Sequence, residues 1–224
     1  MPARVWASFR RTMMAIAVAI ASASPGNQAQ AGTVLLGNSG WQAVWDNSLD
    51  PYVSITNIVV EENTIFLTKN AEFIQGPGRD GLFPTIPIVF QQIAVSSINS
   101  IVIEDENILN NTGADWSDFH FQITGISATF NPGLSSGFDV LPFTSSIFSA
   151  DNKRLDLDDG TVANGTAWTP GAGDEGGRLW IDVISGGVGQ FRFFTLKETP
   201  TPGPTALMVM ATGLLFIPIR RRLR

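Results

Sequence analysis

The sequence predicts an all-β protein: an antiparallel β-sandwich, jelly-roll or immunoglobulin-like, between an N-terminal signal peptide and a C-terminal apolar helix. Three observations predict the sandwich. Apolar and polar residues alternate with period two in several segments, whose apolar positions are rich in β-branched and aromatic residues. Turn-forming Gly, Pro and Asn separate these segments. The middle of the chain has no sustained apolar stripe at helical spacing.

The strand pattern is clearest in seven segments of the middle of the chain. They are residues 52–60, 64–68, 86–93, 100–104, 119–124, 179–184 and 190–197. Residues 154–158 also alternate and run into the Asp159-Gly160 turn signal, which favours a strand followed by a tight turn. Residues 160–177 are so rich in glycine that we expect a long surface loop there.

The N-terminus has the three parts of a secretory signal peptide. A basic segment precedes an apolar run at residues 13–23, and Ala29 and Ala31 supply the small residues that signal peptidase accepts. We therefore expect cleavage before Gly32, which removes residues 1–31. The basic residues are Arg4, Arg10 and Arg11.

Charge and cysteine content narrow the function further. Residues 46–198 hold all 20 acidic residues but only seven of the 14 basic ones, a net charge of −13. Such a surface repels phosphate backbones, so we expect no nucleic-acid partner. The chain has no cysteine, which excludes disulfides and thiolate chemistry. An exported domain of this kind has to be held by its core, and its length predicts one domain.

The C-terminus combines prolines, an apolar run and a cluster of arginines. Residues 205–219 would form a helix of about 22 Å, shorter than the bilayer core of about 30 Å, and Pro218 weakens it further. Such a segment favours a transient stop in the inner membrane, with the arginines held on the cytoplasmic side. The arginines are Arg220, Arg221, Arg222 and Arg224.

This layout resembles the PEP-CTERM sorting signal of Gram-negative bacteria. Pro200-Thr201-Pro202 stands where the family has Pro-Glu-Pro, with Thr201 in place of the glutamate. The resemblance implies processing by an exosortase-type membrane protease and association with exopolysaccharide. We thus divide the chain into a signal peptide (1–31), a β-sandwich (32–197) and a sorting tail (198–224). The predicted function is that of a non-enzymatic protein of the cell envelope or extracellular matrix.

A carbohydrate-binding module is the alternative function. Trp116 and Trp168 are candidate stacking platforms for sugar rings. Alternation places Asp118, His120 and Gln122 together on one face of the strand after Trp116, where they could hydrogen-bond a glycan.

A hydrolase is less expected. Residues 133–137 match G-x-S-x-G, but an Asp115–His120–Ser135 triad has the wrong order for that motif and lacks its strand–helix elbow. We predict no catalytic residues and no cofactor-binding residues. Residues 154–160 do not form a calcium loop, because two leucines stand at its ligand positions. The remaining metal hypothesis is calcium bound by residues 104–106 together with Asp115 or Asp118.

Overall fold

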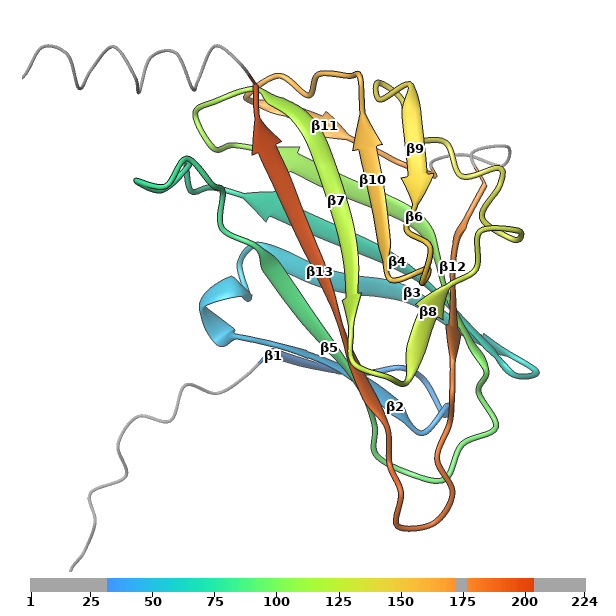
Figure 1. Cartoon of the computed structure of the whole chain (residues 1–224). Helices are drawn as coiled ribbons and strands as arrows, with labels where there is room; N and C mark the ends of the chain where they lie inside the picture. Colours follow the sequence, from blue (N-terminus) through green and yellow to red (C-terminus); the bar gives the residue numbers. More distant parts are fainter. Residues whose placement is uncertain (1–31, 172–176, 204–224) are drawn as a thin grey trace, which may run out of the picture.

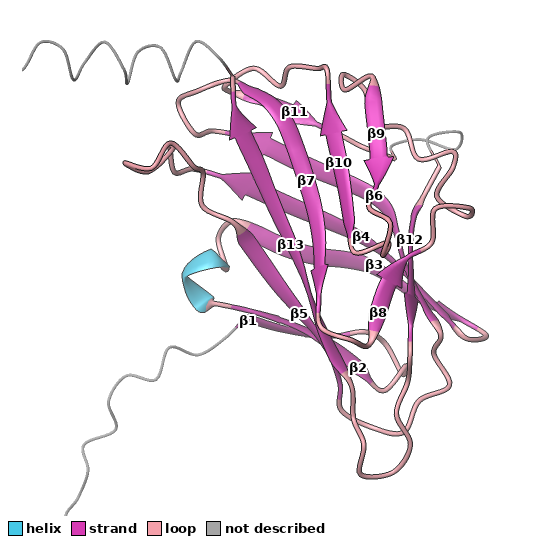
Figure 2. Ribbon diagram, viewed as in Figure 1, coloured by secondary structure: helices cyan, strands magenta, loops and turns pink. Residues whose placement is uncertain are grey.

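The computed structural model describes residues 32–171 and 177–203, which form thirteen strands and one short 3₁₀ helix, η1 (Asn47–Leu49). Figure 1 shows the strands in two layers, and Figure 2 shows that nearly all segments connecting one strand to the next are loops. This part of the protein is therefore all-β, with two packed sheets consistent with the predicted sandwich.

One layer is a seven-stranded antiparallel sheet. Its strands, in spatial order, are β1 (Gly32–Leu35), β2 (Trp41–Trp45), β5 (Ile86–Gln92), β13 (Phe193–Pro202), β7 (Trp116–Thr124), β10 (Arg154–Asp158) and β9 (Ser145–Phe148). The last strand in the sequence, β13, thus lies in the middle of the sheet, between β5 and β7 (Figure 1).

The other layer is a six-stranded sheet, in which five strands follow one another across the sheet and the sixth lies at its side. Its order is β3 (Val53–Glu61), β4 (Thr64–Phe73), β6 (Ser100–Asn110), β12 (Leu179–Val183) and β8 (Ala128–Phe130), and β11 (Thr166–Trp168) pairs with the end of β6. The expectation of purely antiparallel sheets is wrong at one place, because β4 and β6 run parallel. After β4 the chain crosses to the facing sheet, where it forms β5, and then crosses back. As a result, β6 runs in the same direction as β4.

Each of the seven segments with a clear strand pattern overlaps a strand, although β13 begins at Phe193, three residues after the predicted start at residue 190. Residues 154–158 form β10, as their alternation predicted. Asp159 follows β10 with a φ of 58°, as the turn signal predicted. The prediction of one long loop at residues 160–177 is wrong in part, because β11 extends the edge of β6 there. Thr166 and Trp168 are of types that favour strands, and Trp168 reaches the core from β11.

The core lies between the two sheets and is formed by the inward positions of both. It is unusually aromatic around β7, where Phe119 and Phe121 pack against each other with ring centroids 5.1 Å apart. On β4 the inward positions are Ile65, Leu67, Lys69, Ala71 and Phe73. A lysine thus stands within a buried apolar row.

Candidate functional site

The two candidate stacking residues are core residues. Trp116 is 0% exposed and Trp168 is 2% exposed. Trp168 packs edge-on against Phe119 and Phe143, with centroids 4.8 and 5.0 Å away, and Trp116 packs against Phe73 at 5.2 Å. The hypothesis that these rings stack on a sugar is therefore wrong for the folded protein, since neither offers a free face. Tryptophan is large enough that filling the core dominates its placement.

The predicted sorting motif also lies inside the fold. Pro200, Thr201 and Pro202 belong to β13, where they pair with Phe119, Asp118 and Trp116 of β7. Both prolines are buried. The boundary between residues 197 and 198 is thus wrong, because the strand continues to Pro202. A protease could reach this motif only if the end of β13 separated from β7.

Proline occurs here because β13 is longer than its neighbour β5. Pairing with β5 ends at Glu198, so the last residues of β13 have a strand on one side only. A residue without an N–H is tolerated at such an edge. The alternation of β13 continues through both prolines, with Thr199 and Thr201 on the outer face.

The remaining terminal predictions lie mostly outside the described residues. β1 begins at Gly32, the residue that should follow signal cleavage. Ala29, Ala31 and the apolar segment 205–219 are outside the described residues, as are Arg220, Arg221, Arg222 and Arg224. In the part that is described, no helix is long and apolar enough to cross a membrane.

The hydrolase residues each have other partners. Ser135 is buried and its Oγ accepts a hydrogen bond from the backbone of Trp180 at 2.9 Å. Asp115 Oδ1 accepts from the backbone of Asn164 at 2.8 Å. His120 lies on the outer face of the seven-stranded sheet, bonded to other residues. No hydrogen bond joins these three side chains, so the geometry gives a Ser–His–Asp mechanism no support.

The acidic run proposed for calcium is divided between the two sides of its sheet. Glu104 forms an ion pair of 2.8 Å with Arg178, whereas Glu106 points into the core. Across residues 32–171 and 177–203 no three His, Cys, Asp or Glu side chains are grouped as metal ligands.

A buried triad of ionisable residues is the most unusual feature of the core. Lys69 Nζ lies 2.8 Å from Glu106 Oε1 and 2.7 Å from Glu198 Oε2, and all three side chains are 0% exposed. Lys69 and Glu106 are directly paired on β4 and β6, while Glu198 comes from β13 in the facing sheet. The triad therefore links the two layers through the core.

Burial controls the charges of this triad. It raises the pKa of Glu106 to about 8, with the neighbouring Glu198 carboxylate acting in the same direction and the Lys69 ammonium against both. Burial also lowers the pKa of Lys69, but the two carboxyl groups outweigh it and the pKa lies above its ordinary value. At neutral pH these raised pKa values favour a charged Lys69 and a protonated Glu106.

The sequence contains a signal for this triad, although none of its motifs indicates one. Lys69 continues the inward row of β4 with Leu67 and Ala71, and Glu198 continues the inward row of β13 with Leu196 and Pro200. A charged residue in the apolar phase of a period-two pattern indicates a buried charge. Which charges meet could not be predicted, because it depends on the packing of the two sheets.

A second cluster lies on the outer face of the seven-stranded sheet. His120 Nδ1 is 2.7 Å from Asp156 Oδ1, and His120 Nε2 is 3.0 Å from Thr201 Oγ1. Arg154 Nε also contacts Asp156. His120 and Asp118 share this face as the sequence predicted, and burial followed by the Asp158 charge raises the pKa of Asp118.

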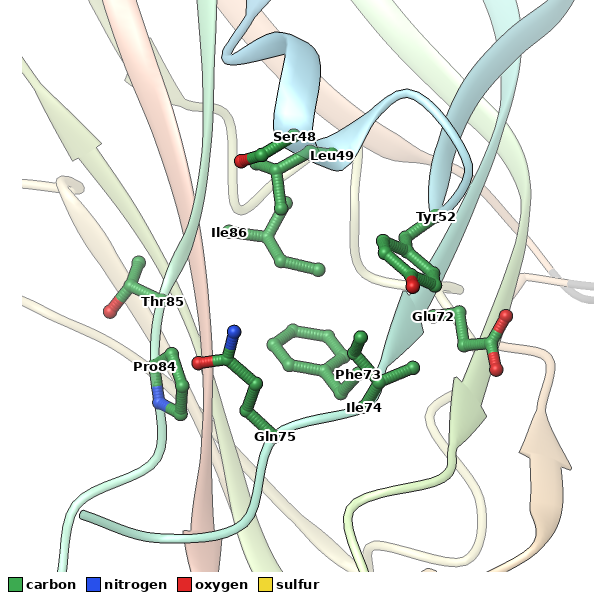
Figure 3. A pocket seen from close by; sticks show the side chains of 10 residues that line it. All are labelled: Ser48, Leu49, Tyr52, Glu72, Phe73, Ile74, Gln75, Pro84, Thr85 and Ile86. Carbon is green, nitrogen blue, oxygen red and sulfur yellow. The ribbon is translucent and has the colours of Figure 1, made fainter.

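A pocket lies where η1, the end of β4 and the start of β5 meet (Figure 3). Its volume is about 120 Å³. Phe73 and Ile86 are buried and give it an apolar base, with Tyr52 and Glu72 on one side and Thr85 on the other (Figure 3). Glu72 Oε1 also accepts a hydrogen bond of 3.1 Å from Asn111.

A second hollow of about 220 Å³ adjoins this pocket and shares Tyr52 and Glu72 with it. It extends over the outer face of the six-stranded sheet, past Ser54, Asn70 and Asn107. We call the two together the Tyr52 groove. Its only charged lining residues are Glu72 and Asp50, both acidic. The groove thus combines the aromatic rings of Tyr52 and Phe73 with apolar surface and with amide and hydroxyl groups.

Comparison with known proteins identifies no relative: no family model, no curated protein and no solved structure matches the chain.

Proposed function

We propose that the protein is a non-enzymatic exported component of the cell envelope or extracellular matrix, with a C-terminal tail processed by an exosortase-type protease. The observation that supports it most is where the fold begins and ends. The described strands lie between Gly32 and Pro202. Removal of residues 1–31 and of residues 204–224 therefore takes no strand from either sheet. A domain bounded in this way can be exported and released intact.

The buried position of Pro200–Pro202 changes the expected cut. A cut within this motif removes the end of a central strand, whereas a cut after Gly203 leaves β13 whole. We therefore place processing beyond Gly203, with the apolar segment 205–219 held transiently in the inner membrane. Association with exopolysaccharide follows from the resemblance of the tail.

The test is expression of the full chain in a host with an exosortase, followed by fractionation and mass determination of both ends. We expect an N-terminus at Gly32, a C-terminus at or after Gly203, and recovery outside the cytoplasm. Replacing the four tail arginines with Gln should release uncut protein into the periplasm, because the positive charges hold the stop in place. A full-length chain in the cytoplasm contradicts export. Unchanged processing of the arginine variant contradicts the sorting role.

For the finer fold class we propose a jelly-roll-like double sheet. The chain crosses between the two sheets after most strands, and its thirteen described strands exceed the seven to nine of immunoglobulin domains.

Carbohydrate binding is the second candidate, and the Tyr52 groove favours it. A sugar ring has apolar C–H faces and a rim of hydroxyls, which match an aromatic ring beside amides and hydroxyls. The two hollows meet at Tyr52 and Glu72, so the groove suits a chain of sugars. Because its charged lining residues are acidic, we propose a neutral or amino-bearing glycan.

Affinity electrophoresis tests this with gels containing a neutral, an amino-bearing or a carboxylate-bearing polysaccharide. We expect retardation by the first or second, and its loss in a Tyr52→Ala variant. Phe193→Ala, which removes an exposed aromatic ring from the other sheet, is the matched control and should bind like the parent. Equal retardation of both variants contradicts the groove, as does preference for the acidic polysaccharide.

A further inference from the structure

The Lys69–Glu106–Glu198 triad holds an amine and two carboxyl groups in contact where water does not reach. Nζ is within 2.8 Å of both carboxyl groups, and no side chain is exposed. Outside the triad, no described group hydrogen-bonds Glu106 or the Oε1 of Glu198. Well-oriented reacting groups within one molecule reach effective concentrations of roughly 10⁵–10⁸ M.

We propose that Lys69 and Glu198 condense to an intramolecular amide, an isopeptide bond between Nζ of Lys69 and Cδ of Glu198, with Glu106 transferring the proton. Lys69 lies on β4 and Glu198 on β13, so this bond joins the two sheets covalently. It is a modification of the folded domain and does not depend on the function proposed above.

The reaction needs no reagent beyond the triad. Transfer of one ammonium proton to the carboxylate of Glu198 leaves three neutral groups, so the reactive amine forms without leaving an unpaired charge in the core. The Nζ lone pair then attacks Cδ of Glu198, and the C=O electron pair moves to oxygen. Glu106 takes a proton from nitrogen and gives its own to the departing hydroxyl. The C–O bond breaks, the C=O re-forms, water leaves, and Glu106 ends unchanged.

The roles of the two glutamates differ in position and protonation. Glu106 neighbours Lys69 in the same sheet, and burial raises its pKa to about 8, so it carries the proton that the leaving hydroxyl requires. Glu198 faces Lys69 from the other sheet at 2.7 Å. A bond to Glu198 also spans 129 positions of the chain. It restricts the unfolded chain as a disulfide does, in a protein without cysteine.

The parent protein itself gives the decisive measurement. The full chain is purified, denatured and weighed by intact mass spectrometry, with Lys69→Arg from the same host as the reference for terminal processing. We expect the parent to be lighter than its sequence by one water, and the reference to match its sequence. Digestion should yield one branched peptide that contains Lys69 and Glu198. A folded parent without the mass deficit overturns the proposal, and so does a branch to Glu106.

Two variants separate the chemical roles. Glu106→Gln keeps both reacting groups but loses the acid, so condensation should slow by roughly 10²- to 10⁴-fold and leave most chains open. Glu198→Gln should still form the amide, now with loss of one ammonia. Glu104→Gln changes a partly exposed glutamate on the same strand and should keep the deficit of one water. Full condensation in Glu106→Gln contradicts the role of Glu106.

Discussion

Among the described residues, the Lys69 triad and the His120 cluster both place basic side chains against carboxyl groups, and the two differ in burial. The Lys69 triad lies between the sheets with 0% exposure, whereas the His120 cluster lies on an outer face with His120 20%, Asp156 30% and Arg154 46% exposed. Both have contacts of 2.7 Å. Contact distance is thus the same, and only the surroundings differ.

The surroundings decide what each cluster contributes. Two unit charges 4 Å apart interact by about 1 kcal/mol in water and by about 4 kcal/mol at the effective dielectric constant of a protein surface. Buried charges also lose their hydration, so each one depends on its partners in the triad. The outer cluster keeps its water and can lose a partner at little cost. Variants at the two places should therefore differ severalfold in effect.

Lys69→Met should have the largest effect. It removes the only cation beside two buried carboxyl groups, along with any bond to Glu198. We expect a loss of about 3–5 kcal/mol in the free energy of unfolding, measured by urea denaturation. The matched control is the triple variant Lys69→Met, Glu106→Leu and Glu198→Leu, which has no buried charge. It should be more stable than the single variant, and a single variant as stable as the parent contradicts the cost assigned to buried charge.

The pH dependence of stability should be the next largest effect. Glu106 has a pKa of about 8 in the fold against an ordinary value of 4.5, so the folded state binds its proton more tightly. The contribution of Glu106 to the free energy of unfolding is complete below pH 4.5. It decreases as pH rises toward 8, by at most about 1.4 kcal/mol per pH unit. The groups facing Glu106 are Lys69 from β4 and Glu198 from β13. Burial raises the pKa of Glu106 whether or not Lys69 and Glu198 are joined by an amide bond.

Urea midpoints of the parent and of Glu106→Gln across pH 5 to 8.5 test this. The parent should lose stability with rising pH, and the variant should lose less over the same interval. Hydrogen bonds from serine hydroxyls lower the pKa values of the exposed Asp46 and Asp151. Their contribution to stability is lost only as pH falls below the ordinary aspartate range, so it stays constant over this interval in both proteins. Parallel curves for the two proteins contradict the raised pKa of Glu106.

The sequence predicted the strands because alternation depends on which face is buried. Prediction from the sequence failed where one residue type suits two different structural roles. Trp116 and Trp168 suit both a binding face and a core, and only packing shows that they fill the core. Pro200 and Pro202 indicate a linker in general, but here β13 extends past β5 and tolerates them.

The candidate sites were harder to predict than the strands. The triad joins β4, β6 and β13, and the Tyr52 groove joins residues from η1 to β6. Both depend on contacts between distant segments, which no local pattern contains. The inward phase of Lys69 was visible in the sequence, but its partners were not.

Asp156→Asn, a change in the exposed cluster, should have the smallest effect on the free energy of unfolding. Asp156 Oδ1 contacts both His120 and Arg154, so the change removes the carboxylate from two contacts at once. We nevertheless expect less than about 1 kcal/mol, because water solvates the separated groups and the long arginine regains its freedom.

Salt distinguishes the two clusters further. Any loss in Asp156→Asn should vanish near 1 M salt, where the Debye length is about 3 Å, because exposed charges are screened. The loss in Lys69→Met should remain, since ions do not reach the core. Urea midpoints of both variants and the parent at low and high salt measure this difference. If Asp156→Asn cost as much as Lys69→Met, or if salt restored both equally, burial would not be what separates the two clusters, and contact distance would be the better guide to their strength.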